Sequence, residues 1–180
     1  MPITTTVRLV NANNQADRTF CVNAAAFAGL KWDENTVRSY ATDPRFHLAI
    51  LLGTWPERGI NNNVRIAMLQ TLRSAGAGGR SRGWCLSIDP TRIPDELQNQ
   101  RGRLKVADFL IHAMVDQAII RGTSKSDVSA PIGSVVVRYL DTLPHDSRIE
   151  GATHIDYVLD IAALKAAFTD PARQLLYGGD

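Results

Sequence analysis

Residues 44–71, PRFHLAILLGTWPERGINNNVRIAMLQT, decide the fold that this sequence predicts. Residues 45–54 form a strongly apolar run of strand length, and a short segment with proline and glycine interrupts it. In the next run, residues 62–72, apolar and polar side chains alternate from Val64 onward, which fits a strand, although the spacing from Val64 to Met68 also fits a helix. Because a short break after a strand-like run favours a hairpin, we interpret 62–72 as a strand.

The N-terminal region predicts a second hairpin. Residues 4–10 alternate between apolar and polar side chains, as in a strand with one buried face. Residues 11–17 are rich in Asn and other residues that tolerate turns, and 18–22 have the composition of a returning strand. Residues 35–43 remain ambiguous between a helical turn and a short strand.

The C-terminal half combines helices with one further strand. The clearest helix is residues 104–120, where apolar side chains recur at spacings of three and four. Residues 132–140 contain consecutive β-branched valines and predict a central strand. The remaining assignments are a possible strand at 84–88, the start of a polar helix at 94–100, a loop at 122–130, an amphipathic helix at 153–168, and a short helix at 171–176 that begins with Asp170 and Pro171.

Length and composition predict one soluble globular domain, residues 1–180. A hydrophobic share of 44% and a charged share of 21% are ordinary for such a domain, and a net charge of +2 does not by itself indicate nucleic acid. We find no signal peptide and no apolar run long enough for a membrane span. Cys21 and Cys85 are far apart in the sequence, so we expect buried thiols, with a disulfide still possible.

The distribution of charge is more informative than its sum. Between Glu57 and Asp89 there is no acidic residue, and a glycine-rich loop at 75–79 lies inside this stretch. An acid-free, arginine-rich stretch suits phosphate groups, because guanidinium donates paired hydrogen bonds to phosphate oxygens. A solvated surface loop is the alternative interpretation. The glycine loop lacks the lysine of a P-loop. The arginines concerned are Arg58, Arg65, Arg73, Arg80 and Arg82.

Enzymatic residues are harder to find. Asp108, His112 and Asp116 are spaced by four on the predicted helix and would share one face, where a metal site or an acid–base pair could form. No further ligands accompany them, and no common hydrolase or metalloprotease motif occurs. We therefore expect a non-enzymatic protein without cofactor or metal.

Three segments, taken in order, resemble the coat proteins of single-stranded RNA bacteriophages of the levivirus type. TTTVRLVNANNQADRTFCVN (residues 4–23) resembles the N-terminal hairpin of that family, and residues 44–71 resemble its paired central strands. GSVVVRYLDTLPHDSRIEGATHIDYVLDIAALKAAFTDPARQLLYGGD (residues 133–180) resembles its last strand and two closing helices. Residues 75–130, with the helix at 104–120, have no counterpart in the family and would be an insertion before the last strand.

The resemblance implies an α+β fold in which an N-terminal hairpin and an antiparallel sheet precede two C-terminal helices. Two chains would form an intertwined dimer, dimers would close into an icosahedral shell, and the shell would package single-stranded RNA in a virion made in the bacterial host's cytoplasm. Val64, Ile66 and Met68 would face the helices, and the opposite sheet face would meet RNA. The expected RNA-binding residues are His47, Asn63, Arg65, Arg73, Ser134 and Arg138.

Two other functions remain open on the sequence. A small dimeric regulator could use the same arginines to bind nucleic acid without forming a shell. A small enzyme could use the face of Asp108, His112 and Asp116.

Overall fold

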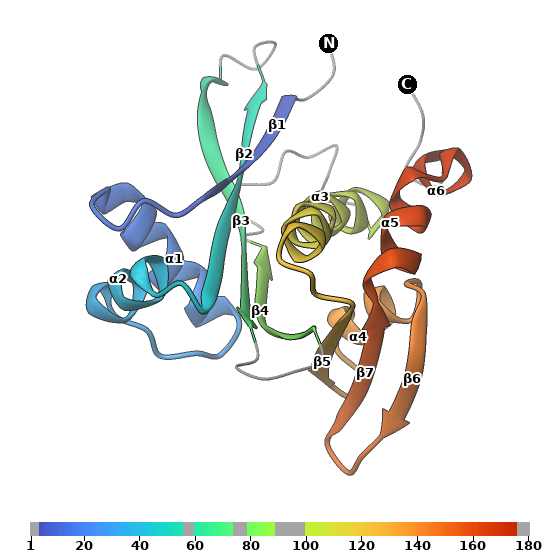
Figure 1. Ribbon diagram of the computed structural model, residues 1–180. Coiled ribbons are helices and arrows are strands. Elements are labelled where there is room, and N and C mark those ends of the chain that lie inside the picture. The colour runs from blue at the N-terminus through green and yellow to red at the C-terminus, as the bar shows by residue number, and fades with distance from the viewer. Residues whose placement is uncertain (1–3, 56–59, 74–78, 89–99, 176–180) are drawn as a thin grey trace.

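The computed structural model describes residues 4–55, 60–73, 79–88 and 100–175, and in this part of the chain it has one mixed sheet with helices on both faces (Figure 1). The strands are β1 (Thr4–Leu9), β2 (Phe46–Trp55), β3 (Ile60–Arg73), β4 (Arg80–Ile88), β5 (Lys125–Pro131), β6 (His145–Glu150) and β7 (His154–Asp160). The helices are α1 (Gln15–Phe27), α2 (Glu34–Thr42), α3 (Gln100–Ile120), α4 (Val135–Leu140), α5 (Ile161–Thr169) and α6 (Pro171–Leu175).

The seven strands lie in the order β1-β2-β3-β4-β5-β7-β6. Neighbours are antiparallel except β4 and β5, which are parallel and are connected through α3. The interpretation of 62–72 as a strand is confirmed, and it pairs with the apolar run before it from Phe46↔Leu72 onward. The predicted strands at 4–10 and 84–88 and the helices at 104–120 and 171–176 are confirmed within a few residues.

Two hydrophobic cores cover the two faces of the sheet. On one face α1 and α2 pack over β2, β3 and β4, and Phe20 and Val37 are buried there. On the other face α3 packs over the same strands, and Val106 and Leu110 are buried there (Figure 1). Within the described residues this part of the sheet therefore has helices on both sides, which leaves no broad sheet face for RNA.

A β-bulge in β3 changes which side chains share a face. Leu51 pairs with Ala67 but Leu52 pairs with Arg65, so Ile66 is an extra residue in β3. Ile66 packs into the core under α3, while Met68 packs into the core under α1 and α2. The predicted shared face of Val64, Ile66 and Met68 is therefore wrong, because strict alternation ends at the bulge.

The predicted fold class is wrong, because its antiparallel sheet, its insertion and its helix pairing are not those of the structure. Residues 18–22 lie in α1, so β1 pairs with β2 and forms no hairpin with them. The supposed insertion at 75–130 contains β4 and β5, which are neighbours inside the sheet, and α3, which connects them. The C-terminal helix α5 packs against α3 of its own chain instead of crossing to the partner of an intertwined dimer.

Three further segments differ because burial by distant elements overrides local preference. The valine-rich residues 132–140 contain the helix α4, in which Val137 and Leu140 are buried at helical spacing. The predicted loop at 122–130 contains β5. The predicted helix at 153–168 is divided between β7, where Ile155 and Leu159 are buried with a period of two, and α5.

Gly79 fixes the start of the parallel pair. Its carbonyl accepts the amides of Ser124 and Lys125 at 2.6 and 3.1 Å. Its φ is +58°, and a Cβ at this position would lie 2.7 Å from the backbone oxygen of Gly122. Both the conformation and the space therefore require glycine here.

Gly79→Ala should destabilise the fold by several kcal/mol, since the backbone of the turn must shift in addition to the cost of a left-handed alanine, about 1–2 kcal/mol. Gly29→Ala is the matched control, because Gly29 has φ +77° but nothing within 4 Å of the new Cβ. Its cost should be the conformational part alone, about 1 kcal/mol. Urea unfolding of both variants measures the difference, and equal losses would contradict the steric role of Gly79.

Candidate active site in the β4–β5 fork

The most distinctive feature of the sheet is that β4 and β5 pair and then separate. They pair over four residues, from Arg80↔Lys125 to Gly83↔Val128. Beyond that point β4 stays with β3 up to Ala67↔Ile88, and β5 stays with β7 up to Pro131↔His154. We call the region between residues 84–88 and 129–131 the β4–β5 fork. Along the fork these backbone edges form no ladder with each other, so their polar groups are open to a ligand.

The closed end of the fork is tightly packed. The hydroxyl of Ser81 donates to that of Ser126 at 3.1 Å across the parallel pair. A Cβ on Gly83 would lie 3.1 Å from Cγ2 of Val128, so glycine allows the close approach of the strands at the last paired position. Thr71 pairs with Gly83 and Gln70 with Cys85, which places a bulge in β4 where the fork begins.

Two helices begin at the open end of the fork. Helix α3 follows β4 and runs back along the sheet, because its last turn, with Ala118, lies beside Ser81 near the start of β4. Its first turn is therefore near the strand ends, and this turn contains no acidic residue. Free N–H groups at the start of a long helix favour anions such as phosphate. Helix α4 follows β5 and is capped by Ser134, whose side chain accepts from the amide of Val137 at 3.3 Å.

A buried polar cluster joins α3, α4 and α6. The hydroxyl of Tyr139 donates to Asp108 at 2.7 Å, and Arg173 donates two hydrogen bonds to the same carboxylate at 2.7 and 2.8 Å. All three residues are at most 9% exposed. Arg173 also donates to the carbonyl of Thr142. The cluster holds Tyr139 in one position and ties the C-terminal helix to the body of the protein.

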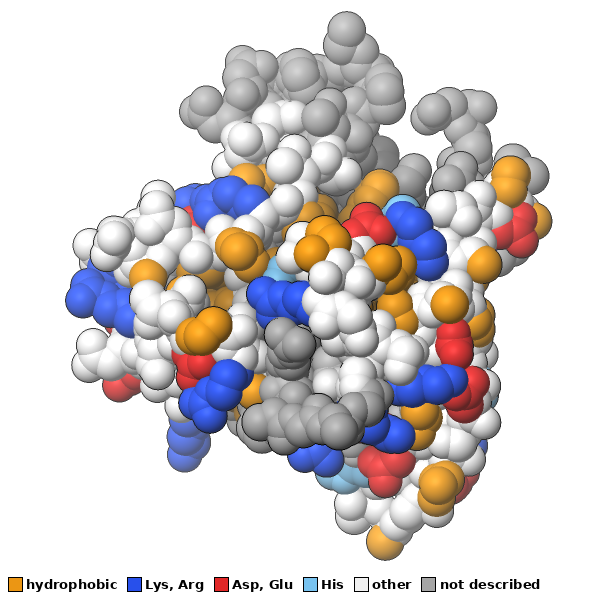
Figure 2. All heavy atoms as spheres, in the orientation of Figure 1, with side chains coloured by type: hydrophobic (Ala, Val, Ile, Leu, Met, Phe, Trp, Pro, Cys, Tyr) orange, Lys and Arg blue, Asp and Glu red, His pale blue; other side chains and the backbone are white. Residues whose placement is uncertain are grey.

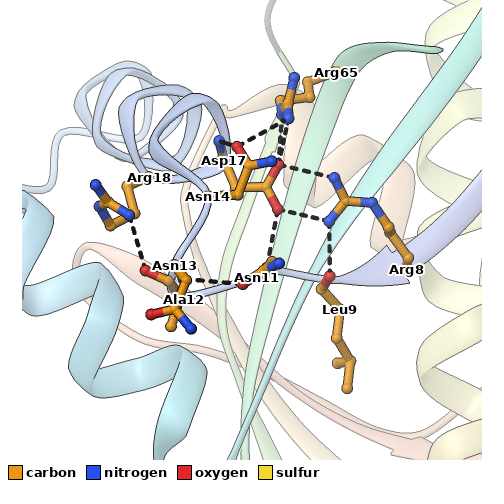
Figure 3. A network of polar contacts seen from close by, with 9 residues as sticks. All are labelled: Arg8, Leu9, Asn11, Ala12, Asn13, Asn14, Asp17, Arg18 and Arg65. Atoms are coloured by element: carbon orange, nitrogen blue, oxygen red, sulfur yellow. Dashed lines mark hydrogen bonds and ion pairs between the residues drawn. The ribbon is translucent and has the colours of Figure 1, made fainter.

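A second polar cluster is centred on Asp17 of α1 (Figure 3). Arg8 of β1 donates to its carboxylate at 2.6 and 2.9 Å, Arg65 of β3 donates at 2.7 Å, and the amide of Asn11 donates at 2.9 Å. Burial raises the pKa of Asp17, but these hydrogen bonds outweigh it and lower that pKa to about 2. Asp17 is therefore ionised at neutral pH.

His47 of β2 is buried under the C-terminal part of α3. Neither ring nitrogen has a hydrogen-bond partner among the described residues. A hollow of about 20 Å³, room for a water molecule, lies beside it. Burial and the nearby charge of Arg121 lower the pKa of His47 to about 4, so the ring is neutral at physiological pH. The hollow is lined by His47, Thr71, Ser81, Met114, Gln117, Ala118, Arg121 and Thr123.

The residues predicted to bind RNA are not gathered in one place. His47 is buried, and Arg65 is bound to Asp17. Asn63 is exposed on β3, whereas Arg138 is exposed on α4 on another part of the fold. Ser134 is the N-cap of α4. Arg73 ends β3, and its side chain lies outside the described residues. Arg58 of the arginine stretch also lies outside them, and Arg80 pairs with Asp127.

The face of Asp108, His112 and Asp116 on α3 is covered by the C-terminal helices. Lys165 of α5 donates to Asp116 at 2.6 Å and to Nε2 of His112 at 3.0 Å, and His112 stacks on Phe168. Asp108 faces Tyr139 and Arg173 instead. The described residues contain no group of three or more metal-binding side chains. This face therefore connects α3 to the C-terminal helices.

Both cysteines are free and buried, as predicted. Burial raises the pKa of Cys21 to about 12 and that of Cys85 to about 11. Neither thiol ionises at neutral pH, which excludes a thiolate nucleophile at these positions. Among the described helices, none is long and apolar enough to cross a bilayer.

No family model matches this sequence, and no curated protein sequence matches it. Solved structures do match. The apo structure of FdhC, a nucleotide-linked sugar GNAT, has a TM-score of 0.66 at 13% identity, and the match covers 94% of each chain. A spermidine N-acetyltransferase from Vibrio cholerae, in complex with CoA and spermine, has a TM-score of 0.61 at 10% identity and covers 89% of this chain and 97% of that one. The ribosomal-protein-S18-alanine N-acetyltransferase from Escherichia coli has a TM-score of 0.58 at 14% identity, covering 88% and 94%.

The fold is that of the GNAT acetyltransferases. The prediction of a phage coat protein is wrong, because the structures that share this fold are acetyltransferases. The predictions that followed from it are wrong for the same reason: a non-enzymatic role, a shell-forming dimer and the packaging of RNA. A place in the virion has no support either.

Sequence reasoning named Asp108 and Arg65 but missed the residues that they contact, Tyr139 and Asp17, and it missed Gly83 at the closed end of the fork. Asn14 followed three residues later by Asp17 is a helix-start signal, and it could have identified α1. Tyr139 was hidden in a run that was interpreted as a strand. Gly83 has no local signal, because the strand that it approaches, β5, lies more than forty residues further along the chain.

His47 should make the protein sensitive to mild acid. The unfolded chain binds a proton at a pKa near 6.5 and the folded ring only near 4, so stability falls as the pH decreases between these values. At pH 5 the protonation of His47 in the unfolded chain should have lowered the free energy of unfolding by ~2 kcal/mol relative to neutral pH. His47→Gln cannot take up the proton, so its unfolding free energy should decrease less between about pH 7 and pH 5. Identical pH profiles for the two proteins would contradict this account.

Asp108→Asn should destabilise the fold by ~3 kcal/mol, because the buried Arg173 loses the charged carboxylate that accepts two of its hydrogen bonds. Asp116→Asn is the control on the same helix. It removes a half-exposed ion pair with Lys165 and should cost less than ~1 kcal/mol. Thermal unfolding compares the two, and a similar small loss for both would show that the Asp108 cluster is not essential to the fold.

Proposed function

We propose that this protein is an N-acetyltransferase that moves an acetyl group from acetyl-coenzyme A to an amine and releases coenzyme A. The observation that carries the proposal is the β4–β5 fork, whose strand edges face each other without pairing beyond Gly83↔Val128. The structures that share the fold support it, since they are acetyltransferases and one contains CoA.

The fork fits the chemistry of coenzyme A. The pantetheine arm is an extended chain with two amide groups, and the open edge of β4 offers backbone donors and acceptors of the kind that an added strand uses. The diphosphate of the same molecule is anionic, and the acid-free first turn of α3 offers N–H groups at the mouth of the fork. The pantetheine arm and the diphosphate thus each have complementary groups on the protein, the edge of β4 and the first turn of α3.

Bound in this way, the thioester supplies an acetyl carbon that an amine nitrogen attacks, so that a C–N bond forms as the C–S bond breaks and the sulfur takes a proton. The residues of this chain would bind and orient the reactants. The close packing of Gly83 on Val128 sets how deep an extended ligand enters, and the hydrogen bond from Tyr139 to Asp108 fixes α4 against α3. Positioning of this kind accounts for a large part of the rate of a two-substrate reaction.

Binding of coenzyme A tests the proposal. Calorimetry with CoA should give a dissociation constant in the micromolar range, roughly 1–100 µM, and thiol release from acetyl-CoA should rise when a suitable amine is added. Gly83→Val should weaken CoA binding about tenfold or more, because the larger side chain forces the strands apart at the end of the fork. No saturable CoA binding at about 1 mM would contradict the proposal.

Val128→Ala in the Gly83→Val background is the matched control. It removes the methyl groups that the new side chain would meet. If the fork acts as described, the double variant should recover most of the lost affinity. Weak CoA binding in Gly83→Val with no recovery in the double variant would indicate general damage to the sheet instead.

A further inference from the structure

The Asp17 cluster contains more positive than negative charge. Arg8 and Arg65 both donate to the carboxylate of Asp17, so two guanidiniums share one counter-charge (Figure 3). The adjacent Arg18 is matched by Glu34 at 2.9 Å. One positive charge therefore remains in this group of residues.

The surplus charge faces the solvent. The side chain of Asp17 is fully buried, whereas 36% of Arg8 and 19% of Arg65 are exposed. Figure 2 shows Lys and Arg side chains at the surface where β1 runs into α1. An anion at this surface would meet guanidinium groups whose counter-charge, the carboxylate of Asp17, lies on the buried side. Hydrogen bonds between a guanidinium and an anion are strong and directional.

Exposed asparagines lie near the Asp17 cluster. Asn63 is exposed and lies two residues before Arg65 in β3, beside a register shift between Gly53 and Trp55 of β2. Asn13 and Asn14 are exposed beside Asp17 at the start of α1, and Nη2 of Arg65 lies 3.5 Å from Oδ1 of Asn14. Guanidinium and amide groups together are the donors that carboxylate and phosphate require.

This group of residues lies close to the open end of the fork. Ala67 of β3 pairs with Ile88, the last residue of β4, and Arg65 is two residues further along β3. With strands about 4.8 Å apart, Arg65 is on the order of 10 Å from the fork. An arginine side chain together with a small amine that it holds by one end spans a distance of this order.

We infer, on the basis of the proposed function, that Arg8, Arg65 and Asn63 bind the acidic group of the acceptor, and that the acceptor is an amine that also carries a carboxylate or a phosphate. The charge on the acceptor then fixes its orientation, with the amine directed towards the fork. A neutral or polycationic amine gains nothing from this surface.

Acceptor selectivity tests the inference. With acetyl-CoA as donor, kcat/KM for 4-aminobutyrate or O-phosphoethanolamine should exceed that for ethanolamine by about tenfold or more, the effect of one favourable ion pair. The ratio of the two acidic amines distinguishes carboxylate from phosphate. A preference for ethanolamine or for spermine would overturn the inference.

Asn63→Asp is the decisive variant, because it adds a negative charge beside Arg65 without touching the hydrogen bonds of Asp17. KM for the acidic amines should rise about fivefold or more, and their kcat/KM should fall by a clearly larger factor than that for ethanolamine. Asn23→Asp, an exposed position on α1, is the control and should leave all acceptors unaffected. Equal losses for acidic and neutral amines in Asn63→Asp would also overturn the inference.

Direct binding separates this inference from the proposed function. O-phosphoethanolamine and 4-aminobutyrate are titrated into the protein in the absence of any donor. Saturable binding of either below about 10 mM, weakened in Asn63→Asp, supports the acidic-ligand site even if CoA does not bind. If CoA binds and neither acidic amine does, the proposed function stands and the acceptor assignment fails.

Discussion

The four residue pairs that join β4 to β5 hold two halves of the sheet together. One half is β1 to β4 under α1 and α2, and the other is β5 to β7. The joint is short but held in several ways: the carbonyl of Gly79 accepts the amides of Ser124 and Lys125 at the start of β5, the hydroxyl of Ser81 donates to that of Ser126, and α3 packs on β4. Because one end of the joint is fixed in this way, the strands can separate at the other end without the sheet coming apart, and a ligand can lie between them.

Two buried carboxylates, Asp108 and Asp17, each bind side chains that are distant in the sequence, but they differ in their surroundings. Asp108 accepts hydrogen bonds from Arg173 and Tyr139, and all three residues are buried. Asp17 is shared by two arginines that reach the surface. A deeply buried cluster serves structure, since an uncompensated charge there would be costly. In the Asp17 cluster the excess positive charge lies on the solvent side, where water stabilises it. This charge can bind an anion.

The sequence predicted elements where local signals agreed. The apolar run at 45–54, the alternation around Val64 and the long stripe at 104–120 were sufficient for β2, β3 and α3. The sequence failed where packing against distant elements decides the structure: β7 was interpreted as part of a helix because Ile155 and Leu159 fit both the helical and the strand period. The interpretation of the acid-free stretch between Glu57 and Asp89 as a phosphate-binding surface failed for a related reason. Arg65 finds its carboxylate 48 residues away and Arg80 finds Asp127 at a separation of 47, so charge in the sequence did not represent charge in space.

The parallel pairing is the part of the candidate site that local sequence patterns could not provide. A hairpin can be inferred from a short break between two strands, but a parallel neighbour is reached only through a crossover helix, and nothing in β4 specifies which later strand it will meet. Residues 75–130 therefore resembled an insertion, although they form the crossover itself. Once β5 is placed beside β4, the other features of the site follow from it: the glycine at Gly83, the start of α3 at the mouth of the fork, and the positive surface of Arg8 and Arg65 near the end of β4. A donor with phosphates and an acceptor with an acidic group would then each have a separate positive anchor, with the uncharged strand edges of the fork between them, where an acetyl group can pass from one to the other.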